Sequence, residues 1–268
     1  MASDCTPLRI AAAVAALNCA AGAGARADEA RTVDEVAAEL ANPLAPVTTL
    51  AGNVRAEMGN GPEDDTNYQL RLQPSFFRPY AENSALLVRT ILPLRSTHWP
   101  VSASGLGDIS IIPYYVPDIT STTFVGYGGA LILPSATEDE LGSGKWAAGP
   151  AVIVAKTGKP ITWGGLVQHV WSFAGDADRA DVSVTTLQPF LTYLLPHGWA
   201  ANLTSESTYN WNADSGDAWT VPLTVGASRV VQFGAEFVNL GLAYVRYLEG
   251  PEGTTESELR LSATYVWR

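Results

Sequence analysis

Cysteine is nearly absent from this chain of 268 residues: its two cysteines, Cys5 and Cys19, both lie near the N-terminus. Residues 28–268 contain none, which excludes a disulfide framework, thiol chemistry and cysteine metal sites from them. Histidine is scarce as well, and the three histidines lack the spacing of a zinc site. We therefore expect no metal and no other cofactor.

Basic residues are also few, with 16 Lys and Arg against 27 Asp and Glu. This balance argues against a nucleic-acid partner, because phosphate binding needs clustered Lys and Arg. No stretch after the N-terminal segment reaches the roughly 18 apolar residues of a transmembrane helix. Yet 47% of the residues are hydrophobic, which is high for a soluble chain with so little lysine.

The N-terminal segment has the features of an export signal. Arg9 supplies positive charge, residues 10–25 are mostly small and apolar, and Ala25 and Ala27 flank Arg26 in the form that signal peptidase cuts. We expect residues 1–27 to be a signal peptide and the mature chain to begin near Asp28. Removal of this segment takes away two basic residues and one acidic residue, which leaves 14 basic and 26 acidic residues.

Polar and apolar residues alternate along most of the chain from residue 49 onward. We count about twelve such segments of roughly ten residues, each bounded by Gly, Pro, Asn or Asp. In the last one, Leu259 and Leu261 alternate with Glu258 and Arg260. The segments begin near residues 49, 66, 83, 106, 121, 145, 160, 182, 198, 217, 235 and 255. This pattern predicts an all-β fold, a transmembrane antiparallel up-and-down β-barrel of about 12 strands over residues 49–268.

Connection lengths separate a membrane barrel from a soluble sandwich, which also alternates. Long connections are expected at 59–66, 96–105, 135–144, 174–181, 212–216 and 249–254. Short turns fall between them, at 81–83, 118–119, 158–159, 196–198 and 233–234. Long loops outside and short periplasmic turns are typical of a barrel in the outer membrane of a Gram-negative cell.

Tryptophans occur near the expected strand ends, where aromatic rings lie at the membrane interfaces. The expected aromatic girdles contain Trp146, Trp163, Trp171, Trp199, Trp211, Trp219 and Trp267. The last strand ends in Trp267-Arg268, close to the terminal aromatic residue that the barrel-assembly machinery reads. We therefore expect that machinery, outer-membrane lipid and lipopolysaccharide as partners.

One helix is expected ahead of the barrel, in a periplasmic segment over residues 28–48. Thr32 to Glu35 has the capping-box form, and Val33, Val36 and Leu40 repeat at helical spacing. This short amphipathic helix either packs on the rim of the barrel or enters the lumen as a plug.

The polar faces of the strands are the best candidates for a functional surface, because they face the lumen if the apolar faces meet lipid. The predicted lumen-lining residues are Asn53, Arg55, Glu57, Arg71, Gln73, Arg89, Gln188, Asn202, Glu206, Glu258 and Arg260. Their mixed charges either pair across the lumen and close it or line a narrow polar path.

Two further kinds of chemistry need weighing. Acidic clusters in the long loops, such as Glu138 to Glu140, lack the spacing of a calcium loop, and we interpret them as solvated. On the expected outer face, antiparallel pairing can bring Ser183 or Thr185 beside His169. A lipid-modifying hydrolase would need such a pair and a third group to orient the imidazole. We expect no catalytic residues.

Several segments resemble a group of bacterial outer-membrane proteins described as transporters or as phenol meta-pathway proteins. These segments are Gly105 to Ile109, Leu141 to Pro150, His169 to Gly175, Asp214 to Pro222 and Ala41 to Leu44. The resemblance implies a porin-like barrel with a transport role, and no catalytic residues. We expect passage of small solutes, hydrophobic or aromatic ones included; the alternatives are a closed structural or surface-interaction barrel and the hydrolase.

Overall fold

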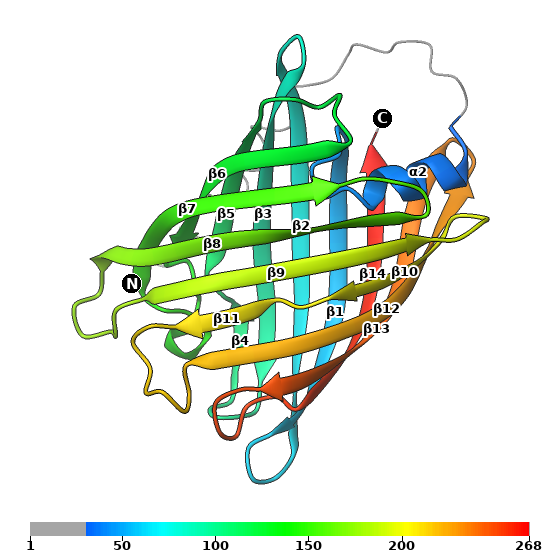
Figure 1. The fold of residues 1–268 in the computed structure, drawn as a ribbon. Coiled ribbons are helices and arrows are strands. Elements are labelled where there is room, and N and C mark those ends of the chain that lie inside the picture. Colours follow the sequence, from blue (N-terminus) through cyan, green and yellow to red (C-terminus); the bar gives the residue numbers. More distant parts are fainter. Residues whose placement is uncertain (1–30, 268) are drawn as a thin grey trace, which may run out of the picture. The chain divides into compact units, whose positions relative to one another are not determined.

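The computed structural model describes residues 31–267, which form a closed antiparallel sheet with one α-helix, α2 (Val33–Leu40), and one short 3₁₀ helix, η1 (Asp139–Leu141) (Figure 1). The strands are β1 (Thr48–Asn60), β2 (Asp65–Ala81), β3 (Ser84–Thr97), β4 (Ala103–Leu106), β5 (Ile109–Val116), β6 (Thr123–Leu133), β7 (Lys145–Lys156), β8 (Ile161–Gly175), β9 (Ser183–Leu194), β10 (Trp199–Thr204), β11 (Ser207–Asn210), β12 (Trp219–Phe233), β13 (Glu236–Glu249) and β14 (Ser257–Trp267). The predicted signal peptide lies outside the described residues.

These strand segments make twelve barrel strands within the described residues, because two strands are interrupted. Strands β10 and β11 pair with β9 and β12 in one continuous register, and pairing is interrupted at 205–206 on the β9 side and at 205–207 on the β12 side. Strands β4 and β5 both pair with β3, with an irregularity at Gly107 and Asp108. Pairing of β1 with β14 closes the ring. The predicted all-β barrel of about twelve strands is confirmed.

Strand starts agree with the alternating segments to within three residues, and the loop asymmetry is largely present. The connections at 134–144, 176–182, 211–218 and 250–256 are long, while those at 82–83 and 234–235 are tight turns. Three expected lengths are wrong. Strands β1 and β2 leave only 61–64 between them, and β3 and β4 leave only 98–102, although long connections were expected in both places. The turn expected at 118–119 is a longer connection at 117–122, in which the carboxylate of Asp118 accepts a hydrogen bond from the N–H of Thr120.

The outward face of the barrel is apolar. Val54, Leu261 and Leu242 lie side by side on β1, β14 and β13, and each side chain is more than half exposed. Their neighbours along β14, Glu258 and Val266, point inward and are fully buried or nearly so. The period of two therefore divides each strand between an apolar outer surface and the barrel interior.

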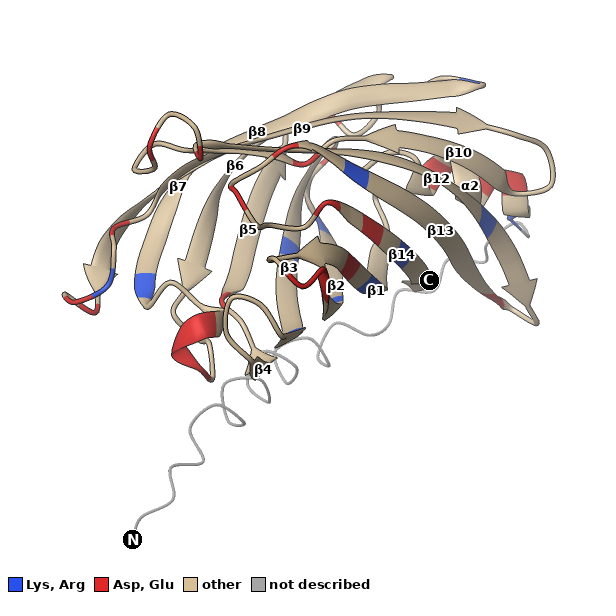
Figure 2. Ribbon diagram, turned by 90° about the horizontal axis from the view of Figure 1, so that it is seen from below, with Lys and Arg blue, Asp and Glu red and all other residues tan. Residues whose placement is uncertain are grey.

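The interior is less polar than the sequence analysis assumed. A buried apolar cluster on β3 and β5–β8 includes Leu87, Ile112, Tyr114, Ile153 and Leu166. In Figure 2 the strands β5, β6 and β8 carry no charged residues, whereas β1 and β14 do. Every apolar face was expected from the sequence to lie against lipid. This rule cannot assign the inward face of a strand that is apolar on both faces. One arc of the barrel wall is thus apolar inside and the opposite arc is charged.

Helix α2 packs on the inner side of β10, β12 and β13, near the end of the barrel where β1 begins and β14 ends (Figure 1). Val36 and Ala37 of the helix are buried against Val230, Phe237 and Val266. No helix of the described residues is long and apolar enough to cross a membrane.

Candidate functional site

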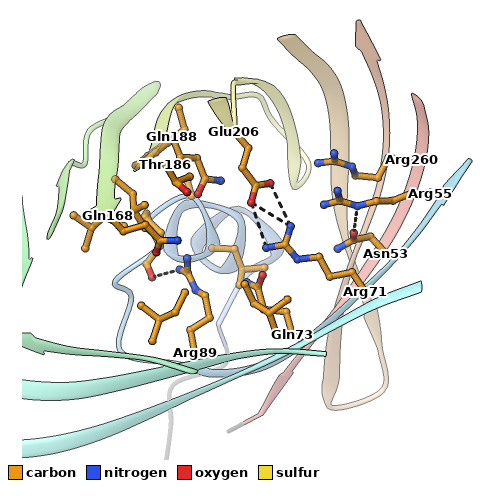
Figure 3. A pocket seen from close by; sticks show the side chains of 18 residues that line it. Asn53, Arg55, Arg71, Gln73, Arg89, Gln168, Thr186, Gln188, Glu206 and Arg260 are labelled. Carbon is orange, nitrogen blue, oxygen red and sulfur yellow. Dashed lines mark hydrogen bonds and ion pairs between the residues drawn. The ribbon is translucent and has the colours of Figure 1, made fainter. Parts of the chain in front are cut away.

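A cavity of about 290 Å³ lies inside the barrel (Figure 3). Its polar lining consists of Asn53, Arg55, Arg71, Gln73, Arg89, Gln168, Thr186, Gln188, Glu206 and Arg260. Its apolar lining consists of Leu40, Ala41, Pro43, Ile91, Ile112, Ile153, Leu166 and Phe190. The cavity is therefore bounded by both arcs of the wall and by the segment that follows α2.

An ion pair crosses the lumen at this cavity. Arg71 on β2 donates from both terminal nitrogens to the carboxylate of Glu206, with an N–O distance of 3.2 Å (Figure 3). The two strands are five places apart around the ring of twelve in one direction and seven in the other. Glu206 lies in the interruption between β10 and β11, next to Ser205, whose N–H donates to the carbonyl oxygen of Pro189 on β9.

A second charged group lies in the wall of β1 and β14. The carboxylate of Glu258 is completely buried, 2.7 Å from Nε of Arg260 and 3.6 Å from Nε of Arg55. The hydroxyl of Tyr247 on β13 lies 3.5 Å from the same carboxylate. A buried carboxylate with two guanidinium partners is compensated in charge, so Glu258 fixes both arginines at the cavity surface.

The segment after α2 reaches into the cavity and contacts both kinds of wall. Arg89 donates to the carbonyl oxygen of Pro43 at 3.3 Å. Leu44 is completely buried in the apolar cluster, next to Gly126 and Ile153. A Cβ atom at position 126 would lie only 3.1 Å from the Leu44 side chain, so glycine there lets Leu44 approach the β6 backbone. The role of this segment as a plug stays a prediction.

Most of the predicted lumen residues meet at this cavity, but three do not. Asn202 lines a smaller neighbouring cavity and bonds to Thr192 and Ser228. Glu57 is half-buried away from the main cavity, and Glu258 lies behind its arginines. A role of these residues in passage stays a prediction.

The apolar lining and two polar residues of the cavity, Gln168 and Thr186, were not predicted from the sequence. Both polar residues are on the phase of Gln188, which was predicted: Gln168 pairs with Thr186 across β8 and β9, and Thr186 is two residues from Gln188. That register could have revealed them. Because both faces of β7 and β8 are apolar, the alternation of side chains does not distinguish an inward Ile153 or Leu166 from an outward residue.

The predicted girdle tryptophans lie toward strand ends, and all but Trp219 have strongly exposed side chains. Trp219 is half-buried and packs edge-on against Tyr209. The sequence cannot show that partner. Their position at the membrane interfaces stays a prediction.

The pair considered for a hydrolase does form on the outer wall. Nδ1 of His169 lies 2.7 Å from the hydroxyl of Thr185, which also accepts a hydrogen bond from Trp211. The imidazole packs on Trp171, with ring centroids 4.0 Å apart. Within residues 31–267, Nε2 of His169 has no hydrogen-bond partner. His169 and Thr185 therefore form part of a cluster with Trp171 and Trp211, which fits a structural contact.

Charged side chains connect the loop at 176–182 to the loop at 134–144 and to the start of β7. Lys145 lies 3.2 Å from the carboxylate of Asp181, and its hydrogen bond, together with that of Ser172, lowers the pKa of Asp181. Arg179 donates to the carbonyl oxygen of Asp139. No group of three or more His, Cys, Asp or Glu side chains among the described residues is arranged to hold a metal ion.

No protein-family model and no curated protein matches this sequence. Solved structures do match: an outer membrane channel from Pseudomonas putida F1 is similar with a TM-score of 0.65 at 15% identity, over 83% of this chain and 96% of that chain. The NanC porin is similar with a TM-score of 0.54 at 12% identity, over 82% of this chain and 99% of that chain. The chain has the fold of outer-membrane channels and porins. The more specific resemblance, to transporters and phenol meta-pathway proteins of the outer membrane, stays a prediction.

Proposed function

We propose that this channel-like barrel lies in the outer membrane and lets small solutes pass through its lumen. The observation that supports this best is the cavity of about 290 Å³ inside a closed barrel, lined by charged and apolar side chains. A barrel interior serving only stability would be filled by side chains, as in small barrels. An open space lined by arginine side chains fits a path for solutes better than it fits a packed interior.

The outer face supports the membrane location in this proposal. Apolar rows such as Val54, Leu261 and Leu242 would each be costly to expose to water, whereas lipid would cover them. The acidic loops and the exposed tryptophans would meet lipopolysaccharide and headgroups at the two interfaces. Strand β14 would be the element read by the barrel-assembly machinery.

A second candidate is a closed barrel that acts through its surface. Two observations favour it: the Arg71–Glu206 pair crosses the lumen, and Leu44 occupies its apolar side. Both obstructions are held by a few contacts of single side chains or of one short segment. We therefore regard them as constrictions of a channel, and permeability decides between the two candidates.

Liposome swelling separates the candidates. Folded barrel is reconstituted into liposomes, which are diluted into isotonic solutions of neutral solutes of increasing size, from glycerol through arabinose to sucrose. A channel with a cavity of this size predicts swelling that is fast for glycerol and negligible for sucrose. Swelling no faster than in protein-free liposomes for every solute would favour the closed barrel.

A further inference from the structure

The cavity has two chemically different walls on opposite arcs of the barrel. Arg55, Arg71 and Arg260 project from β1, β2 and β14, which are neighbours in the ring. Ile153 and Leu166 project from β7 and β8, on the other side, and both are almost completely buried. A ligand that fills this space therefore contacts cations with one end and aliphatic side chains with the other.

Charge in the cavity wall is not balanced. Four guanidinium groups line the cavity, and two carboxylates, Glu206 and Glu258, form ion pairs with them. Glu57 lies close enough to interact by charge with Arg55 and Arg260, which leaves an excess of one positive charge. The chain as a whole has a net charge of −11, so this excess runs against its composition. An anion from solution would remove the imbalance, and cations would be repelled.

Arg89 is the arginine best placed to receive an anion. One terminal nitrogen donates to the carbonyl oxygen of Pro43, and the Nε is buried with no hydrogen-bond partner among the described residues. A guanidinium group carries five N–H donors and recognises a carboxylate through two parallel hydrogen bonds. Arg89 also stands at the junction of the two walls, because Ile91 lines the cavity two residues further along the same strand.

We propose that this cavity binds small organic monoanions in which a carboxylate is joined to an apolar group, such as arylcarboxylates. The carboxylate pairs with Arg89, and the apolar group contacts Ile153 and Leu166. This inference rests on the proposed function, because a solute reaches the cavity through the lumen.

The two walls also exclude other classes of small molecule. A neutral aromatic compound would leave the buried Nε of Arg89 unpaired, which costs free energy. A sugar would place hydroxyl groups against Ile153 and Leu166, where they find no hydrogen-bond partner. An acetate ion would pair with arginine but would bury little apolar surface. A small aromatic acid satisfies both walls within a cavity at the lower end of ligand-site volumes.

Calorimetric titration of the folded barrel in detergent tests this inference without requiring conduction. The probes are sodium benzoate, sodium acetate and benzyl alcohol. We expect benzoate to bind at least about tenfold more tightly than acetate or benzyl alcohol, since it alone gains both the charged hydrogen bonds and the apolar contact. Equal affinities for the three probes, or no heat of binding with benzoate, would overturn the proposal.

Variants test whether the charged wall binds the carboxylate and the apolar wall binds the ring of benzoate. Arg89→Gln should weaken benzoate binding about tenfold or more, and Arg89→Lys should restore part of the loss because it keeps the charge. Leu166→Asn should weaken binding of benzoate but not of acetate. Arg229→Gln is the matched control, since Arg229 lies on the outer wall over Trp199. Folding of each variant is checked by its heat-modifiable mobility on gels. An unchanged benzoate affinity in folded Arg89→Gln would contradict the assignment.

Results for binding and for permeation can be told apart. Benzoate binding by a barrel that causes no liposome swelling would support this site and overturn the proposed function. Swelling without selective benzoate binding would support the channel and overturn this site.

Discussion

Arg71 and Glu206 form an ion pair across the lumen, at 3.2 Å, from strands that are five places apart around the barrel. Their side chains are partly exposed, with 15% and 35% of their surfaces accessible, so the pair faces the cavity rather than a sealed core. An ion pair in this position narrows the lumen and links two opposite walls of the barrel.

Glu206→Gln should raise the single-channel conductance, because it removes the charge that draws Arg71 across the lumen. The free energy of unfolding should fall by about 1–3 kcal/mol, between the values for exposed and for buried pairs. Planar-bilayer recording measures the first effect and urea unfolding the second. Glu256→Gln is the control: it breaks the Arg246–Glu256 pair, which has the same distance of 3.2 Å but lies exposed beside a loop. A conductance equal to that of the unmodified barrel would show that the pair does not limit the path.

Glu258→Gln should be more destabilising than Glu206→Gln. Its carboxylate is completely buried and serves both Arg55 and Arg260, so the substitution leaves two guanidinium groups without their counter-charge. Removal of one partner from a buried charged group costs about 3–5 kcal/mol. Equilibrium unfolding in urea, followed by tryptophan fluorescence, measures the loss. A cost below that of Glu206→Gln would mean that water reaches Glu258.

Leu44→Asn should release the segment after α2 from the apolar wall and increase the conductance. The side chain is completely buried among Ile153 and its neighbours, and an amide there finds no partner. Leu242→Asn, on the exposed outer face, is the control for loss of a leucine. Conductance and the distribution of current levels are recorded for both. If Leu44→Asn conducts like the unmodified barrel, the segment does not constrict the lumen.

The contact between Lys145 and Asp181 should weaken in acid. The pKa of Asp181 lies below its ordinary value of 3.8, because Lys145 and Ser172 donate hydrogen bonds to the carboxylate. A lowered pKa in the folded state means that the contact stabilises the loops above about pH 4 and is lost as the pH falls through the lowered value. Hydrogen-exchange protection of residues 176–182 should therefore decrease below pH 4, and it should not change between pH 5 and pH 7. Asp181→Asn should show no such acid-dependent step.

Leu261→Arg tests whether the outer face meets lipid. Leu261 lies between Val54 and Leu242 in the middle of an exposed apolar row. An arginine on the lipid face near the bilayer midplane costs about 2–4 kcal/mol. Unfolding is measured in liposomes, with Glu252→Arg in the loop at 250–256 as the control. A cost below about 0.5 kcal/mol in the bilayer would contradict a lipid-facing position.

The sequence predicted the strands well because one physical rule, side chains on alternate faces, acts on every strand. Leu259 and Leu261 against Glu258 and Arg260 reveal β14 without any knowledge of its partners. The same rule identified Arg55, Arg71 and Arg89 as inward residues. It failed for β5 to β8, where Ile153 faces inward and Val152 and Val154 face outward, because both faces are apolar.

Contacts between strands that are distant in the sequence could not be predicted from the alternation of polar and apolar residues. The pairing of Arg71 with Glu206 depends on the circumference of the closed ring and on the shift between strands, which no local pattern records. The position of α2 depends on Val36 and Leu44 finding apolar residues inside the barrel. From the sequence alone, packing on the rim and entry into the lumen both stayed open.

Single-channel recording of the unmodified barrel in a planar lipid bilayer tests the proposed function most directly. A channel narrowed by the Arg71–Glu206 pair predicts discrete openings of small conductance, with anions carrying more current than cations because four arginines line the cavity. A folded, inserted barrel that shows no openings at any applied voltage would contradict the proposed channel function.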